Sequence, residues 1–109
     1  LEIDQVNAIR HLVANAVHYT PPGGRVDVRC GSDGTGAWLE VTDNGPGIPE
    51  AERERVFDRF YRRPGEQESG SGLGLAIVRA IADRHDAVVS LHAAQGGGLL
   101  ARVVFLKLG

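Results

Sequence analysis

The chain has 109 residues, of which 42% are apolar and 24% charged, as expected for one soluble globular domain and not for a disordered or fibrous protein. Its 12 Lys and Arg against 14 Asp and Glu give a net charge of -2, which offers no general attraction for nucleic acid or an anionic membrane. The single cysteine, Cys30, excludes a disulfide within the chain, and no apolar run approaches the ~18 residues of a membrane span.

The first half of the chain predicts one helix and a hairpin. Apolar residues at three- and four-residue intervals predict an amphipathic helix over residues 4–18. Two prolines and two glycines within residues 20–24 end that helix in a turn. Alternating apolar and polar residues then predict two strands over 26–30 and 37–43, joined as a hairpin.

The second half begins with a long loop over residues 44–72, which contains one short helical segment at about 50–57. A second helix is predicted over 73–86, and two further strands over 88–93 and 99–106. These elements predict an α+β fold, a two-layer sandwich with helices on one face of an antiparallel or mixed sheet.

A carboxylate at the end of the second strand is the first candidate for chemistry. Side-chain alternation puts Asp43 on the same face as the apolar Leu39 and Val41. A carboxylate against a core costs several kcal/mol unless donors meet it, so protein groups or a ligand must supply them. The following Asn-Gly-Pro-Gly also has the chemistry of an ordinary turn, which is the alternative for Asp43 alone.

A glycine cluster, Gly70-Ser71-Gly72-Leu73-Gly74, opens the second helix. Its bare backbone N–H groups would lie where the helix dipole adds partial positive charge, an arrangement that binds phosphate. No Gly-Lys-Ser/Thr follows, as a P-loop requires, and the polar residues 66–69 precede it where a dinucleotide fingerprint has a strand. A flexible helix entry without a ligand is the alternative.

Polar residues on the first helix form a third pattern, since His11, Asn15 and His18 share one stripe beside its apolar face. Asn15 offers a neutral oxygen of the kind that Mg²⁺ accepts together with waters and phosphates. A fourth pattern is the segment 56–63, which combines aromatic residues with arginines that can clamp phosphates. Solvated helix surface is the alternative for both.

In order, these pieces resemble the N, G1, F and G2 boxes of the ATP-binding domain of sensor histidine kinases, within the GHKL family shared with gyrase, Hsp90 and MutL. The resemblance is carried by the segments 15–21, 43–49, 57–62 and 70–78, so it extends over nearly the whole chain. It implies the Bergerat fold, a two-layer α/β sandwich whose mixed sheet is covered by helices on one face.

The resemblance also implies ATP and Mg²⁺ as cofactors. Asn15 would coordinate Mg²⁺, Asp43 would accept a hydrogen bond from the adenine amino group, and Gly45 and Gly47 would shape the base pocket. His18 would lie in the same site, where the family usually has Lys or Arg. The residues implied near the nucleotide and its phosphates are Tyr19, Arg59, Arg62, Gly70, Ser71, Gly72, Leu73 and Gly74.

Two departures from the family pattern concern the reaction and the fold. His11 stands where histidine kinases have an Asn and ATP-hydrolysing relatives a catalytic Glu, so we expect poor ATP hydrolysis by the chain alone. His11 itself is a candidate base, a candidate neighbour of the groups that hold the metal, or a polar residue lining a cleft. The family's domain usually opens with a strand before the first helix, and only residues 1–3 could supply it here, so we expect a sheet that is short by one strand, or a segment that is disordered or removed.

The sequence therefore predicts one ATP-binding catalytic domain over 1–109, which donates the γ-phosphoryl group of ATP to a histidine on a separate helical dimerisation and phosphoacceptor domain. The implied partners are that domain and a response regulator. The chain itself is expected to be monomeric and cytoplasmic, with the parent protein in the bacterial inner membrane. Two alternatives remain: a serine kinase of the anti-sigma-factor type, and a nucleotide-dependent interaction module without phosphoryl transfer.

Overall fold

The computed structural model describes residues 3–34, 36–58 and 74–106. In chain order the elements are α1 (Ile3–Tyr19), β1 (Val26–Ser32), β2 (Gly36–Asp43), the 3₁₀ turns η1 (Glu50–Glu52) and η2 (Arg55–Phe57), α2 (Gly74–Arg84), β3 (Ala87–Ala93) and β4 (Leu99–Leu106). The predicted helices and strands are confirmed, with every boundary within two residues of its expected place.

The short helical piece after β2 is not continuous. Its backbone N–H groups bond to the carbonyl three residues back, from Arg53 to Glu50 and from Asp58 to Arg55, which is 3₁₀ geometry. Two separate turns therefore replace the single helical piece expected over 50–57.

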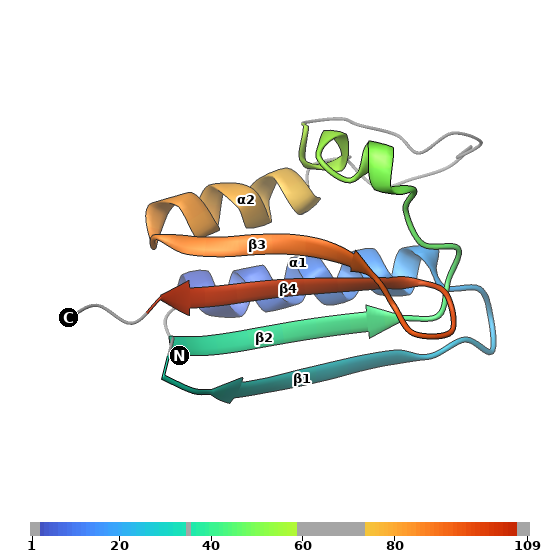
Figure 1. Cartoon of the computed structure of the whole chain (residues 1–109), viewed down its shortest axis with the longest axis horizontal. Coiled ribbons are helices and arrows are strands. Elements are labelled where there is room, and N and C mark those ends of the chain that lie inside the picture. The colour runs from blue at the N-terminus through green and yellow to red at the C-terminus, as the bar shows by residue number, and fades with distance from the viewer. Residues whose placement is uncertain (1–2, 35, 59–73, 107–109) are drawn as a thin grey trace.

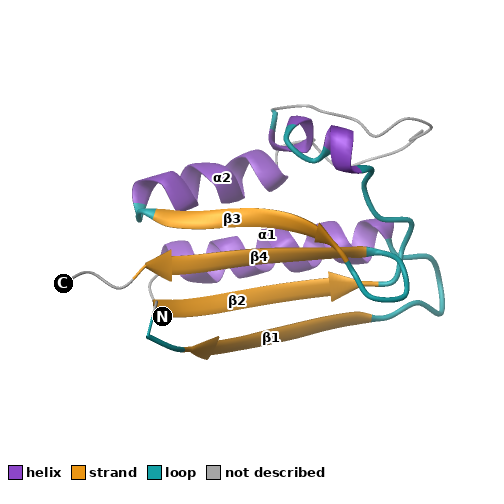
Figure 2. Cartoon of the chain, in the orientation of Figure 1, coloured by secondary structure: helices purple, strands orange, loops and turns teal. Residues whose placement is uncertain are grey.

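All three strand pairings are antiparallel, and the sheet order is β1-β2-β4-β3 (Figure 2). β2 and β3 run in the same direction because each is antiparallel to β4, which lies between them. A connection through α2 would give a parallel pair only if β2 and β3 were neighbours. The expectation of an antiparallel sheet is therefore confirmed, and the expectation of a mixed sheet is wrong for the described strands.

Both helices cover the same face of the sheet, with α1 packed on β2 and α2 packed on β3 (Figure 1). This arrangement confirms the two-layer α+β sandwich. The opposite face carries Trp38 and an ion pair between Glu40 and Arg102, whose guanidinium lies 5.4 Å from the Trp38 ring centroid. None of the helices in the described part of the chain combines the length and apolar character that a bilayer crossing needs.

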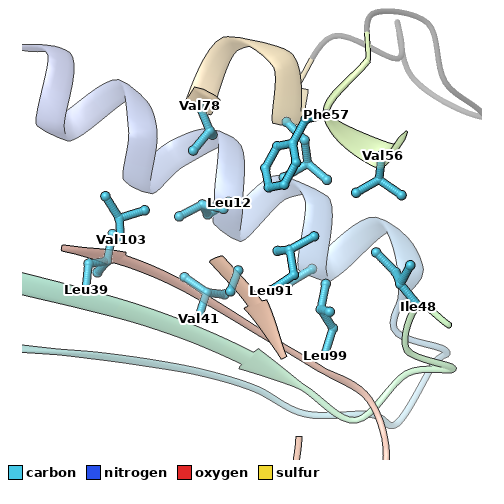
Figure 3. Close-up of a cluster of buried hydrophobic side chains, with 13 residues drawn as sticks. Leu12, Leu39, Val41, Ile48, Val56, Phe57, Val78, Leu91, Leu99 and Val103 are labelled. Atoms are coloured by element: carbon cyan, nitrogen blue, oxygen red, sulfur yellow. The ribbon is translucent and has the colours of Figure 1, made fainter. Parts of the chain in front are cut away.

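The core lies between the helices and the sheet. Leu12 of α1, Val78 of α2 and Val103 of β4 are the most deeply buried large side chains (Figure 3). Burying such a side chain contributes about 1.5–3 kcal/mol. Ile48 and Phe57 join the same cluster from the segment after β2, so that segment is anchored on the core at both of its described ends.

Candidate functional site

Asp43, the last residue of β2, is a buried carboxylate. It is 6% exposed and is the one charged residue among the buried residues that the structure describes. Its Oδ1 accepts hydrogen bonds from the backbone N–H of Gly45 at 2.9 Å and of Leu99 at 3.3 Å. Its Oδ2 accepts none from the described residues. Since buried carboxylate oxygens require donors, Oδ2 is suited to a donor from a ligand.

The position of Asp43 follows from strand periodicity. Leu39, Val41 and Asp43 alternate onto the face that the helices cover, and all three are buried. This confirms the orientation predicted from the sequence. Beyond Asn44 the chain cannot continue the strand, because Pro46 has no N–H to donate to a ladder and Gly47 takes a positive φ of 74°.

Three glycines leave the backbone around Asp43 without side chains. A Cβ on Gly98 would lie 2.0 Å from the Asp43 carbonyl oxygen, and one on Gly47 would lie 2.9 Å from the Gly98 carbonyl oxygen. A Cβ on Gly45 would lie 2.7 Å from the Tyr19 carbonyl oxygen. The turn after β2 is therefore pressed between the start of β4 and the end of α1, where only main chain fits.

The end of α1 lies beside this turn at Tyr19, and the same helix carries His11, Asn15 and His18. His18 and Tyr19 contact each other edge to face, with ring centroids 4.7 Å apart and planes at 85°. His18 is exposed, whereas His11 and Asn15 are half-buried. The Asn15 side chain makes no hydrogen bond to the residues that the structure describes, so its amide oxygen fits the oxygen ligand that Mg²⁺ requires.

The chain leaving the turn is held against α2. Arg53 donates from Nε to the carbonyl of Ile48 at 3.1 Å. The Arg79 guanidinium of α2 lies 4.2 Å from the Phe57 ring centroid and pairs with Glu54 at 3.2 Å. These contacts link η2 to the helix that begins at Gly74.

Comparison with known proteins identifies the family. Residues 2–109 match the family model for histidine kinase-, DNA gyrase B-, and HSP90-like ATPases. A solved mycobacterial sensor histidine kinase, MprB, has a TM-score of 0.82 and 40% sequence identity over 92% of this chain and 70% of that chain. This chain belongs to the ATP-binding catalytic domains of sensor histidine kinases.

Curated relatives of this kinase domain are much longer. MprB of Mycobacterium sp. (strain KMS) is 47% identical over 93 residues, which are 84% of this chain and 18% of MprB. QseC of Escherichia coli (strain K12) is 44% identical over 95 residues, which are 87% of this chain and 20% of QseC. The kinase domain thus spans about a fifth of the length of these relatives.

The structure brings only part of the predicted kinase site together. Asp43, Gly45 and Gly47 form one turn, Tyr19 contacts it through the main chain, and Gly74 begins α2. Six further predicted residues, two arginines and four members of the glycine cluster, lie outside the described residues. They are Arg59, Arg62, Gly70, Ser71, Gly72 and Leu73.

Sequence reasoning missed two parts of this site, Gly98 and the N–H of Leu99. Gly98 follows two other glycines, between the strands predicted over 88–93 and 99–106. Its sequence signal is a glycine directly before a strand. A Cβ on Gly96 or Gly97, however, would have no neighbour within 4 Å, so only the tertiary contact with Asp43 separates Gly98 from them.

Proposed function

We propose that this kinase domain binds Mg²⁺–ATP and donates the γ-phosphoryl group to a histidine on a separate helical phosphoacceptor domain. The observation that carries the proposal is the buried Asp43 carboxylate, whose Oδ2 has no donor among the described residues. The exocyclic amino group of adenine is a donor of the complementary kind. A hydrogen bond to a buried charged group contributes about 1.5–3 kcal/mol.

Asn15 is the proposed protein ligand of Mg²⁺. This ion usually keeps several waters and takes its other ligands from phosphates and one or two side chains. When bound, it neutralises charge on the transferring phosphates. The N-terminus of α2 at Gly74 would add partial positive charge beside them, and His18, Tyr19, Arg59, Arg62 and residues 70–73 remain proposed neighbours of the nucleotide.

The proposed reaction is transfer to a histidine and not to water. His11 lies one helical turn before Asn15. At this position the ATP-hydrolysing proteins of the family that the sequence resembles have a glutamate base. In the transfer, an imidazole nitrogen of the acceptor forms a bond to the γ-phosphorus, and the bond to the β–γ bridging oxygen breaks to release ADP. The domain contributes position and charge stabilisation.

The parent protein is proposed to supply what this chain does not contain. Because the domain spans about a fifth of its curated relatives, the rest of the parent has room for the acceptor domain and a sensor. We place the parent in the bacterial inner membrane, this domain on the cytoplasmic side, and a response regulator as the next phosphoryl acceptor.

The first stage of the test is nucleotide binding. ATP is titrated calorimetrically into the wild type and Asp43→Ala, each with and without Mg²⁺. We expect Mg²⁺ to strengthen binding and Asp43→Ala to weaken it about tenfold or more. Asp27→Ala is the matched control, because it removes an exposed carboxylate from β1. Undiminished binding by Asp43→Ala would refute the assignment.

The second stage is phosphoryl transfer. The domain is mixed with γ-labelled ATP and the phosphoacceptor domain of a related sensor kinase, and the label is tested for stability in acid. Acid-labile label on the acceptor, with slow hydrolysis by the domain alone, is the expected result. Acid-stable label on a serine would favour the serine-kinase alternative, and nucleotide binding without any label would favour the interaction module.

A further inference from the structure

Asn44, directly after Asp43, joins the two hairpin strands in an unusual way. Val26, the first residue of β1, pairs with Asp43, the last residue of β2. Arg25 and Asn44 are therefore the next opposed residues beyond this end of the ladder. The N–H of Asn44 donates to the Arg25 carbonyl at 3.2 Å. The N–H of Arg25 donates to the Asn44 side-chain Oδ1 at 2.7 Å, and not to a main-chain carbonyl.

The side chain of Asn44 thereby replaces its own carbonyl in the ladder. In an antiparallel sheet, two residues of a hydrogen-bonded pair exchange both N–H···O bonds through their main chains. Because Oδ1 satisfies Arg25, the Asn44 carbonyl is released and the main chain can turn at once. That immediate turn allows the Gly45 N–H to reach Asp43 Oδ1 at 2.9 Å.

The same side chain also contacts the segment that connects α1 to β1. A Cβ on Gly24 would lie 2.9 Å from Asn44 Oδ1 and 2.2 Å from Thr20 Cγ2. Thr20 in turn donates from Oγ1 to the Ala16 carbonyl at 2.7 Å. Three chain segments therefore meet at Asn44: the end of α1, the start of β1 and the turn after β2.

From this geometry we infer that Asn44 is a positioning residue for base recognition, an inference that rests on the proposed function. Its side chain selects the turn over an extension of the β1–β2 ladder, and so holds Asp43 Oδ1 in its bonds to Gly45 and Leu99. Asp43 Oδ2 then keeps one orientation for a base. Without Oδ1 of Asn44, the Arg25 N–H would draw the Asn44 carbonyl back into the ladder and open the turn.

Nucleotide selectivity tests this role separately from general stability. We expect Asn44→Ala to weaken ATP binding about three- to tenfold and to reduce the preference for ATP over GTP, measured as the ratio of their Kd values. Guanine has a carbonyl where adenine has its amino group, so the ratio reports on Asp43. Asn44→Asp keeps the acceptor oxygen and should restore both values.

The matched control is Arg25→Ala, which keeps the backbone N–H and C=O used by Asn44. It removes only an exposed side chain that pairs with Asp27 at 2.9 Å, so ATP affinity and selectivity should be unchanged. Equal losses of ATP and GTP binding in Asn44→Ala, or no rescue by Asn44→Asp, would overturn the inference.

A readout without nucleotide separates this inference from the proposed function. Amide exchange of Gly45 and Leu99, measured by NMR on the free domain, should be faster in Asn44→Ala than in the wild type and normal in Asn44→Asp. Unchanged exchange would refute the positioning role even if ATP binds. If exchange changes as expected but the wild type does not bind ATP, the proposed function fails and the link from Asn44 to Asp43 remains.

Discussion

Gly96, Gly97 and Gly98 all have positive φ, at 84°, 96° and 88°, yet only Gly98 has a neighbour that a side chain would displace. That neighbour is the main chain of Asp43. At the residue scale, the buried carboxylate is therefore placed by backbone contacts as well as by its two hydrogen bonds.

Replacing Gly98 by alanine should damage the site, whereas the same change at Gly97 should not. A left-handed alanine costs both variants about 1–2 kcal/mol, but only Gly98→Ala also forces Asp43 away. We expect ATP affinity to fall about tenfold or more for Gly98→Ala and to stay near wild type for Gly97→Ala, by calorimetry. Equal affinities in the two variants would contradict the backbone contact.

At the element scale, α2 has two tasks. Its apolar side packs on the core through Leu75 and Val78, and its half-buried Arg79 holds η2 by a ring contact and an ion pair. Phe57 is buried, and the Arg79 guanidinium lies over its ring. This contact holds η2 against α2. The link depends more on the ring than on Glu54, whose side chain is 81% exposed.

Removal of Arg79 should therefore cost more than removal of its ion-pair partner. We expect Arg79→Ala to lower the free energy of unfolding by about 1–2 kcal/mol, because the cation–π contact with Phe57 and the packing of the Arg79 methylene groups are lost. Glu54→Ala should change it by less than about 0.5 kcal/mol. Urea unfolding of both variants checks this, and similar losses would show that the ion pair dominates.

At the scale of the whole molecule, one layer of helices covers one face of a four-stranded sheet. Leu12 lies in the middle of that contact and is 2% exposed (Figure 3). On the same helix, Val17 points away from the core and is 59% exposed. A domain of this size has a total stability of only about 5–15 kcal/mol, so the central contact carries a large share.

Truncating Leu12 to alanine should lower the free energy of unfolding by about 2–5 kcal/mol through lost burial and a cavity. Val17→Ala serves as the control on the same helix and should stay within about 0.5 kcal/mol. Thermal and urea unfolding measure both. A loss for Val17→Ala as large as for Leu12→Ala would mean that the exposed flank of α1 packs against something in solution.

The sequence by itself determined the helices, the strands and the face on which Asp43 lies. These features depend on local periods of 3.6 and 2 residues and on Gly and Pro at turns, so neighbours along the chain are enough to specify them. The motifs around Asn15, Asp43 and the glycine cluster also identified the family, because each keeps its residues at short, fixed spacing.

Only the tertiary structure decided the sheet order and the partners of Asp43. β4 lies between β2 and β3, which no local pattern specifies because strand order depends on pairing between distant segments. The Leu99 N–H that reaches Asp43 comes from 56 residues further along the chain. Gly98 and the side chain of Asn44 likewise acquire their importance from contacts across the fold, where long-range packing brings main-chain groups to the one buried carboxylate that the described chain contains.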